Sequence, residues 1–301
     1  MNSPEHWKQE AQRLSATNPL QSLFATSHYH LQLDDATGCI KTYTKAVDSI
    51  IIDANQNGYS SIATEISILE KFPNANLKLT KQIKLYLAIA VYLIADRSDK
   101  NHSIKQFEHH KIRNEHFKTP VVIIAGGASF MDKTKLDSYR EFIRELMHDF
   151  KGTIISGGTT AGIPGLVGEV KSALQKEGPV DFDLVAYLPV HLPVDSVKSP
   201  AYDRFNETES DTFSVLEVLS YWNDLIGNGI APKNVIVLGI EGGEIAAMEY
   251  RIALSLGAEL VLVANSGRAA SELLTDENWK NHPNLKVIPN DPLIIRTLVN
   301  P

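Results

Sequence analysis

Four short segments combine glycine with hydroxyl-bearing, acidic or cationic side chains, and each follows a run of aliphatic residues. They are residues 125–129 (AGGAS), 156–165 (SGGTTAGIPG), 239–244 (GIEGGE) and 265–268 (NSGR). Glycine lets a ligand approach the backbone closely, and the N–H groups that begin a helix carry unsatisfied partial positive charge. Turns of this kind bind phosphate groups without needing a lysine. The alternative is that each glycine serves only the geometry of a tight turn.

Side chains within these turns add to the phosphate chemistry. Thr159, Thr160 and Ser266 carry hydroxyl donors, and the guanidinium of Arg268 can hold one phosphate through two hydrogen bonds. None of the turns contains the Gly-Lys-Ser/Thr of a Walker A loop or a GxGxxG fingerprint, which disfavours a nicotinamide dehydrogenase. Because four such turns recur, we favour ligand binding over turn geometry alone.

Two glutamates follow the third turn. Glu244 stands at the first position of the expected helix, where a carboxylate complements the helix dipole, and we favour that capping role. Glu249, five residues on, leaves two interpretations open. It accepts hydrogen bonds from ribose hydroxyls or acts as a general acid or base, or it is a surface carboxylate that pairs with Arg251 or with a neighbouring helix.

A long polar segment over residues 190–212 separates two of the expected elements. A loop of this length inside a compact domain is usually functional or disordered. Tyr202 or Phe205 could stack on a base, and Arg204 could reach a phosphate. A disordered surface loop explains the composition equally well.

Other kinds of site find little support in the sequence. No Ser-His-Asp or Cys-His arrangement has a recognisable spacing, which disfavours a nucleophilic triad. The single cysteine, Cys39, can form neither an internal disulfide nor a zinc site by itself. Residues 97–118 contain histidines without cysteines or carboxylates at ligand spacing, and we interpret them as a solvated linker. We therefore expect no metal and no cofactor.

The segments that must position the glycine turns alternate between strand and helix. Short aliphatic runs predict strands over residues 121–125, 153–156, 184–188, 235–239, 259–264 and 286–289. Amphipathic stretches predict helices over residues 136–150, up to 177, 213–227, 244–256, a short stretch after 267, and 292–299. Repeated strand–helix units predict an α/β fold with a doubly wound parallel sheet. Ligands bind outside the carboxyl ends of such strands, where all four turns fall.

The chain before residue 118 has a different pattern. Its helical periodicity and scarcity of glycine predict a smaller all-α domain over residues 1–118, followed by a second domain over residues 119–301. Helices are expected over residues 39–54, 62–69 and 79–96. The stretch 85–95 is apolar on every side, and we favour the centre of a small bundle over an oligomer contact.

The composition narrows the class of protein. Of 301 residues, 43% are hydrophobic and 22% are charged, which is typical of a globular chain. The net charge of −7 disfavours non-specific binding to nucleic acid. The polar N-terminus has no secretory signal, and the apolar run is too short to span a bilayer. We therefore expect a cytoplasmic protein without a membrane span.

The glycine turns and their flanks resemble a known superfamily. Residues 119–301 are similar to the SLOG superfamily, in its TRPM-type branch shared by bacterial proteins and the N-terminal nucleotide-binding region of TRPM channels. The resemblance rests on VVIIAGGAS, IISGGTTAGIPGLVGEV, VIVLGIEGGEIAAMEYRIALSLGA and NSGRAASELL, in this order. It implies a Rossmann-like fold that binds a nucleotide, often ADP-ribose or a cyclic relative, usually as a sensor. The nucleotide-binding residues that it implies are Gly126, Gly127, Ser129, Gly157, Gly158, Thr159, Thr160, Gly162, Gly242, Gly243, Glu244, Ser266, Gly267 and Arg268.

An enzymatic branch of the same superfamily, the LOG-type phosphoribohydrolases, carries the motif PGGxGTxxE. The aligned segment here is EGGEIAAME, in which Glu249 falls on the catalytic glutamate while Ile245 and Ala246 replace the Gly-Thr pair. No Met-x-x-Arg-Lys segment supplies the arginine of that branch. The resemblance therefore favours binding without turnover, and Glu249 is the candidate catalytic residue if an N-glycosidic bond is hydrolysed.

These observations lead to one preferred hypothesis and two alternatives. We expect a sensor that binds an ADP-ribose-type or cyclic nucleotide at the carboxyl edge of the sheet. Binding would be relayed to the helical domain or to a homo-oligomer. The first alternative is a LOG-like hydrolase of nucleoside monophosphates. The second is a structural or partner-binding module with a vestigial pocket.

Overall fold

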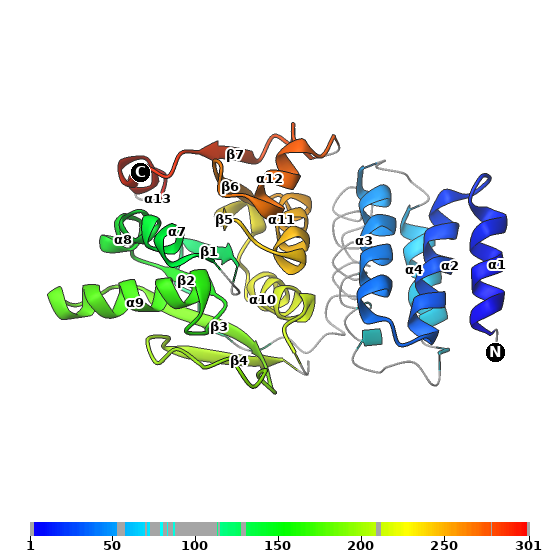
Figure 1. Cartoon of the computed structure of the whole chain (residues 1–301), viewed down its shortest axis with the longest axis horizontal. Coiled ribbons are helices and arrows are strands. Elements are labelled where there is room, and N and C mark those ends of the chain that lie inside the picture. The colour runs from blue at the N-terminus through cyan, green and yellow to red at the C-terminus, as the bar shows by residue number, and fades with distance from the viewer. Residues whose placement is uncertain are drawn as a thin grey trace. The chain divides into compact units, whose positions relative to one another are not determined.

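The computed structural model divides the chain into two compact units, residues 1–112 and residues 113–301 (Figure 1). Each unit is described by itself. The described residues are 3–52, 58–69, 71–72, 79–80, 83, 87, 113, 115–127, 131–208, 212–277 and 279–299.

The described part of the first unit consists of helices. They are α1 (Pro4–Leu14), α2 (Pro19–Gln32), α3 (Ala36–Ile52) and α4 (Gly58–Leu69). Helix α2 packs against both α1 and α3. Ser3 and Asn18 cap α1 and α2 with their side chains, and a proline follows each cap. The expected helices over 39–54 and 62–69 fall on α3 and α4, whereas most of the expected helix over 79–96 lies outside the described residues.

The second unit is built on a seven-stranded parallel sheet, as the sequence predicts. Its strands are β1 (Val121–Gly126), β2 (Thr153–Ser156), β3 (Asp183–Pro189), β4 (Arg204–Thr208), β5 (Val235–Ile240), β6 (Glu259–Val263) and β7 (Leu285–Ile288). Their order is β4-β3-β2-β1-β5-β6-β7, and every neighbouring pair is parallel. The order therefore reverses between β1 and β5.

Helices cover both faces of this sheet (Figure 1). They are α7 (Lys133–Ser138), α8 (Arg140–His148), α9 (Gly162–Glu177), α10 (Val215–Gly227), α11 (Glu244–Leu256), α12 (Arg268–Thr275) and α13 (Pro292–Val299), with a 3₁₀ turn at Pro232–Asn234. Side chains of α8, α9 and α13 join Val122 and Ile124 in the main apolar core. Helices α10 and α11 contact the sheet from its other face. Burial on both faces explains why β1 is an uninterrupted aliphatic run.

The structure corrects two expectations about elements. The single helix expected over 136–150 is two helices, because the chain bends at Tyr139, where φ is −92° and ψ is −5°. The loop expected over 190–212 contains the edge strand β4. Its most buried side chains, Asn206 and Thr208, are polar, so the strand lacks the apolar run that marks the others.

Candidate functional site

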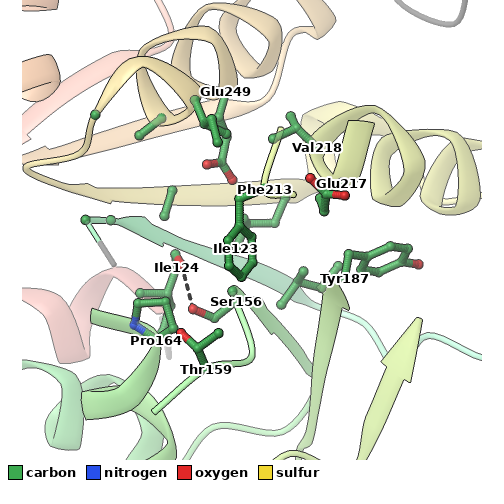
Figure 2. Close-up of a pocket in the computed structure, with 18 of the residues that line it drawn as sticks. Ile123, Ile124, Ser156, Thr159, Pro164, Tyr187, Phe213, Glu217, Val218 and Glu249 are labelled. Atoms are coloured by element: carbon green, nitrogen blue, oxygen red, sulfur yellow. Dashed lines mark hydrogen bonds between the residues drawn. The ribbon is translucent and has the colours of Figure 1, made fainter. Parts of the chain in front are cut away.

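A cavity of about 520 Å³ opens at the carboxyl ends of β1 and β2. Figure 2 shows it bordered by these strands, by α10 and by α11. It lies beside the reversal of strand order, which is where doubly wound sheets bind their ligands. Its volume is in the range of small-molecule sites. The cavity is therefore the candidate ligand site of the second unit.

Aliphatic and aromatic side chains form one part of its wall. Ile123 of β1 and Tyr187 of β3 border the cavity from the sheet, with the ring of Tyr187 directed away from Ile123, and Val218 and Phe213 border it from α10 and the segment before it. The hydroxyl of Tyr187 donates to the buried carboxylate of Asp224 at 2.9 Å. This part of the cavity suits the flat or apolar portion of a ligand.

The first turn of α11 presents unpaired backbone donors to the cavity. Gly243, Glu244, Ile245 and Ala246 all border it, and the N-cap glycine has no side chain to accept a hydrogen bond. Among the described residues, the N–H groups of Glu244, Ile245 and Ala246 find no hydrogen-bond acceptor. Three free N–H groups at a helix N-terminus favour an anion at this position.

The N-termini of α9 and α12 differ, because most of their first-turn N–H groups are already used within the protein or are absent at a proline. The N–H groups of Ala269 and Ala270 donate to the carbonyls of residues 241–242, at 3.3 and 3.0 Å. The N–H of Ile163 donates to the carbonyl of Gly127 at 3.0 Å, and a proline follows it. In the described part of the chain, only the N–H of the first residue, Gly162 in α9 and Arg268 in α12, is left without an acceptor, so these helices offer fewer free first-turn amides than α11.

Arg268 brings a guanidinium to the cavity that has no partner in the described part of the chain. A Cβ atom at Gly127 would stand 3.4 Å from its Nη1, and one at Gly243 would stand 3.2 Å from its Nη2. The guanidinium therefore lies against two of the glycine turns. Arg268 has a φ of 50°, which costs about 1–2 kcal/mol in a residue other than glycine. Backbone strain of this kind is frequent at ligand sites.

Thr159 supplies a second polar group without a partner. The residue is 2% exposed and borders the cavity, and its Oγ1 makes no hydrogen bond to the described residues (Figure 2). Leaving a hydroxyl buried and unsatisfied costs about 1–3 kcal/mol. The turn is held in place from outside, because the N–H of Ser199 donates to the carbonyl of Gly158 at 2.9 Å. A polar ligand atom beside Thr159 would remove the penalty.

Glu249 brings a buried carboxyl group from α11 into the cavity (Figure 2). Burial raises its pKa to about 7, and the hydrogen bond from the Tyr221 hydroxyl, at 2.6 Å, opposes this effect. The group thus gains and loses a proton near neutral pH. The alternative of a surface carboxylate paired with Arg251 is wrong, because Glu249 is buried and Arg251 pairs with Asp276 at 2.8 Å. The contact to a neighbouring helix exists in the hydrogen bond from Tyr221 of α10.

Glu217 is a cavity residue that the sequence reasoning missed. It is buried, and its carboxylate accepts from the backbone N–H of Ser214 at 2.7 Å and from the hydroxyl of Thr208. The first contact is one half of a capping box, for which the Ser-x-x-Glu spacing over 214–217 is the sequence signal. Glu217 therefore fixes the start of α10 and, with it, the place of Phe213.

The predicted site residues divide between the cavity and the turns that support it. Those that border the cavity are Gly126, Gly127, Gly157, Thr159, Gly243, Glu244, Glu249 and Arg268. Those that do not border it but belong to the same turns are Gly158, Thr160, Gly162, Gly242, Ser266 and Gly267. Gly242 shows the supporting role, because its φ is 93° and a Cβ there would stand 2.4 Å from that of Ala246. Ser266 accepts the N–H of Glu241 at 3.1 Å.

Two other predicted residues do not join this site, and a third is not described. Tyr202 is 5% exposed, and its hydroxyl donates to the carbonyl of Pro164 at 3.0 Å within the core. Arg204 begins β4 at the amino edge of the sheet and donates to the carbonyl of His116 at 3.0 Å. Both are therefore left out of the candidate site, because they stand in other contacts away from the cavity. Ser129 lies outside the described residues.

The described residues can also be searched for metal-binding groups and for membrane-spanning helices. They include no group of three or more His, Cys, Asp or Glu side chains able to hold a metal ion. No helix among them combines the length and the apolar character needed to cross a membrane. Most of the histidines of the segment 97–118 lie outside the described residues.

Comparison with known proteins gives one family and a set of similar folds. The family model described as SLOG in TRPM, prokaryote, matches residues 119–289, more than half of the chain. A search of curated proteins finds no significant match. The molybdenum cofactor carrier protein from Chlamydomonas reinhardtii is a similar solved structure, with 16% identity and a TM-score of 0.41, over 60% of this chain and 96% of that one.

The molybdenum cofactor binding protein from the phototrophic bacterium Rippkaea orientalis is similar to the same degree. It has 14% identity and a TM-score of 0.41, over 60% of this chain and 98% of that one. The family match, unlike the two similar structures, has defined residue bounds and can be compared with the site. Residues 119–289 include all seven strands and every residue that borders the cavity.

Proposed function

The chain belongs to the family described as SLOG in TRPM, prokaryote, and we propose that its second unit binds an ADP-ribose-type or cyclic nucleotide as a sensor. The ligand occupies the cavity at the carboxyl ends of β1 and β2. Its phosphates face the first turn of α11 and Arg268. Its base or ribose lies along Phe213 and Ile123.

One observation carries this proposal: three kinds of unpaired donor meet in a single cavity. They are the N–H groups of the first turn of α11, the guanidinium of Arg268 and the hydroxyl of Thr159. The hydroxyl of Thr159 is buried, and folded proteins leave few buried polar groups without partners. Arg268 is exposed, and its charge beside this hydroxyl and the N–H groups favours a ligand rich in acceptors. A diphosphate meets this requirement, since its oxygens only accept hydrogen bonds and carry negative charge.

The opposite part of the cavity supports a ligand that has a ribose or a base beside its phosphates. Glu249 titrates near pH 7 and can therefore accept from a hydroxyl or donate to a ring nitrogen. The ring of Phe213 and the side chain of Ile123 offer apolar surface for a flat group. An inorganic anion alone would leave these groups without a role.

The direct test is a titration of the full chain with ADP-ribose, a cyclic ADP-ribose isomer, NAD and AMP. A ligand present at about a hundred times its Kd stabilises the folded state by about 2.7 kcal/mol. We therefore expect a clear rise in melting temperature with at least one of them, and calorimetry would give its affinity. If none shifts the transition at millimolar concentration, the partner-binding alternative is favoured instead.

The relay is a separate part of the proposal. We expect a homo-oligomer, or the helical domain over residues 1–118, to respond when the domain over residues 119–301 binds its nucleotide. Light scattering and amide hydrogen exchange, with and without the bound nucleotide, test this response. Unchanged mass together with unchanged exchange in residues 1–118 would contradict the relay and leave the binding proposal intact.

Hydrolysis of an N-glycosidic bond is the second candidate, and the position of Glu249 favours it. A carboxyl group with a pKa of about 7 can act as a general acid or base at neutral pH. Ile245 and Ala246 stand where the hydrolase motif has Gly-Thr. Chromatography of AMP incubated overnight with the protein tests this candidate: free adenine that disappears with Glu249→Gln would support turnover, and intact AMP would contradict it.

A further inference from the structure

An ion pair connects three of the strand–helix connections that meet at the cavity. Lys135 of α7, which follows β1, pairs with Glu241 in the turn after β5. Its ammonium group also donates to the carbonyl of Ser266, in the turn after β6, at 2.7 Å. The side chain of Glu241 is 7% exposed and that of Lys135 is 42% exposed. The carboxylate is therefore buried, and Lys135 is its cation.

The backbone of Glu241 is fixed independently of this ion pair. Its N–H donates to the hydroxyl of Ser266 at 3.1 Å. Its carbonyl accepts from the N–H of Ala270 at 3.0 Å and from the hydroxyl of Tyr250 at 3.2 Å. The carboxylate therefore remains beside the glycine turns even if its cation is removed.

Glu241 also lies close to the unpaired guanidinium of Arg268. A Cβ atom at Gly127 would stand 3.4 Å from Nη1 of Arg268 and 3.8 Å from Oε2 of Glu241. Both groups thus border the same small space in front of Gly127. Glu241 pairs with Lys135, and in the described part of the chain Arg268 pairs with nothing.

From this arrangement we propose that Lys135 is a positioning residue, which neutralises Glu241 and so keeps Arg268 available for a phosphate of the ligand. Without Lys135, the nearest unpaired cation for Glu241 is Arg268. A ligand phosphate would then have to displace a buried carboxylate from the guanidinium. This inference rests on the proposed nucleotide binding, and it assigns Lys135 a role without contact to the ligand.

The test compares variants of the full chain by calorimetric titration with ADP-ribose and with inorganic pyrophosphate. We expect Lys135→Met to weaken binding by about tenfold or more, because Arg268 becomes paired. Lys135→Arg keeps the cation and retains the affinity. Glu241→Gln removes the competing carboxylate and tightens binding. The double variant K135M/E241Q recovers the wild-type affinity to within about threefold, because neither charge remains.

Recovery of affinity in the double variant distinguishes a positioning role of Lys135 from direct contact with the phosphate and from stabilisation of the fold. If Lys135 touched the phosphate, K135M/E241Q would bind as weakly as K135M. If Lys135 only stabilised the fold, K135M would lower the melting temperature and leave the affinity unchanged. Either result overturns the proposal. Should K135M fail to fold, E241Q alone still decides, because binding that is unchanged or weaker in E241Q contradicts the competition.

Lys118 offers the matched control. Its side chain is 48% exposed and pairs with Asp183 at 2.9 Å, at the amino edge of the sheet. Lys118→Met removes a comparable ion pair and is expected to bind both probes as the wild type does. If the wild type binds neither probe nor any of the nucleotides named above, nucleotide binding itself is contradicted. If the wild type and K135M bind equally well, only the role of Lys135 is contradicted.

Discussion

The turns before α11 and α12 are similar in sequence and different in what they offer a ligand. Each follows a buried strand, has glycine at the N-cap and lacks a capping hydrogen bond from a side chain. Among the described residues, the first three N–H groups of α11 find no acceptor, whereas two of the first three of α12, those of Ala269 and Ala270, donate to the carbonyls of residues 241–242. The α12 turn instead contributes the side chain of Arg268. A glycine-rich turn therefore indicates a binding edge, and backbone pairing decides which donor it supplies.

The free N–H groups of α11 and the paired ones of α12 have one cause, which is the backbone conformation of the turn before α11. Glu241 and Gly242 both have positive φ, of 57° and 93°, and their carbonyls accept from Ala270 and Ala269 at the start of α12. The turn before α11 thereby satisfies the N-terminus of α12. No comparable acceptor approaches the start of α11 in the described part of the chain.

The largest expected difference between α11 and α12 is in how a glutamate on each helix changes the stability with pH. Glu249 of α11 is buried with its pKa raised from 4.5 to about 7, so the folded state holds its proton more tightly than the unfolded state. This contribution to stability is complete below pH 4.5 and is lost as the pH rises to about 7, at a cost of about 3 kcal/mol. We expect Glu249→Gln to be more stable than the wild type at pH 8, with the advantage vanishing near pH 4.5. Urea unfolding over this range measures it.

Glu272 provides the control on α12, because it is exposed. Glu272→Gln is expected to change the free energy of unfolding by less than about 0.5 kcal/mol at every pH. A pH dependence equal in E249Q and the wild type would show that Glu249 does not differ from a surface acid.

Arg268 tests the donor that α12 contributes. Because the guanidinium has no partner in the described part of the chain, Arg268→Ala should leave the melting temperature unchanged. Loss of charge-assisted hydrogen bonds to phosphate should weaken binding of ADP-ribose by about 30- to 100-fold, measured by calorimetry. Arg268→Lys keeps the charge without the planar fork and should recover only part of the affinity. Wild-type affinity in R268A would remove α12 from the site.

Proline at position 244 tests the donors that α11 contributes. Proline is accepted at the first position of a helix, and it removes one N–H group there. Gly243 precedes it in an extended conformation, with φ −101° and ψ −155°, which suits a following proline. Relative to Glu244→Ala, we expect Glu244→Pro to bind ADP-ribose about fivefold more weakly at equal stability.

The corresponding change in α12 should act on the fold. Ala269→Pro removes a hydrogen bond to residues 241–242 and is expected to lower the melting temperature. If E244P and E244A bind equally well, the free N–H groups of α11 do not contact the ligand.

Thr159→Val is the smallest of these perturbations. It replaces an unpaired buried hydroxyl with a methyl group of similar shape, so the stability without ligand should stay the same or rise by up to about 1 kcal/mol. Binding of ADP-ribose should weaken by about threefold, through loss of one neutral hydrogen bond. A variant with reduced stability and unchanged affinity would mean that the hydroxyl serves the fold.

The sheet and the position of the site were predictable from the sequence. Aliphatic runs such as 121–125 and 259–264 exclude water from both faces, so they form parallel strands covered by helices. Glycine turns that follow such strands meet at the carboxyl edge whatever the remaining details of the fold. The family was also recognisable from these turns, and the match over residues 119–289 confirms it. Strand β4 was not predicted, because its buried side chains, Asn206 and Thr208, are polar and form no apolar run.

The sequence by itself therefore determined six of the seven strands, their parallel arrangement and the edge where the glycine turns meet, because local hydrophobic patterns dictate these features. Only the tertiary structure decided which donors remain free, how Glu249 becomes buried and which cation neutralises Glu241. Each of these depends on contacts between segments far apart in the chain, such as the pairing of Lys135 with a residue 106 positions away. No local pattern encodes such pairings, because the same glycine turn can satisfy its N–H groups or leave them open according to what packs beside it.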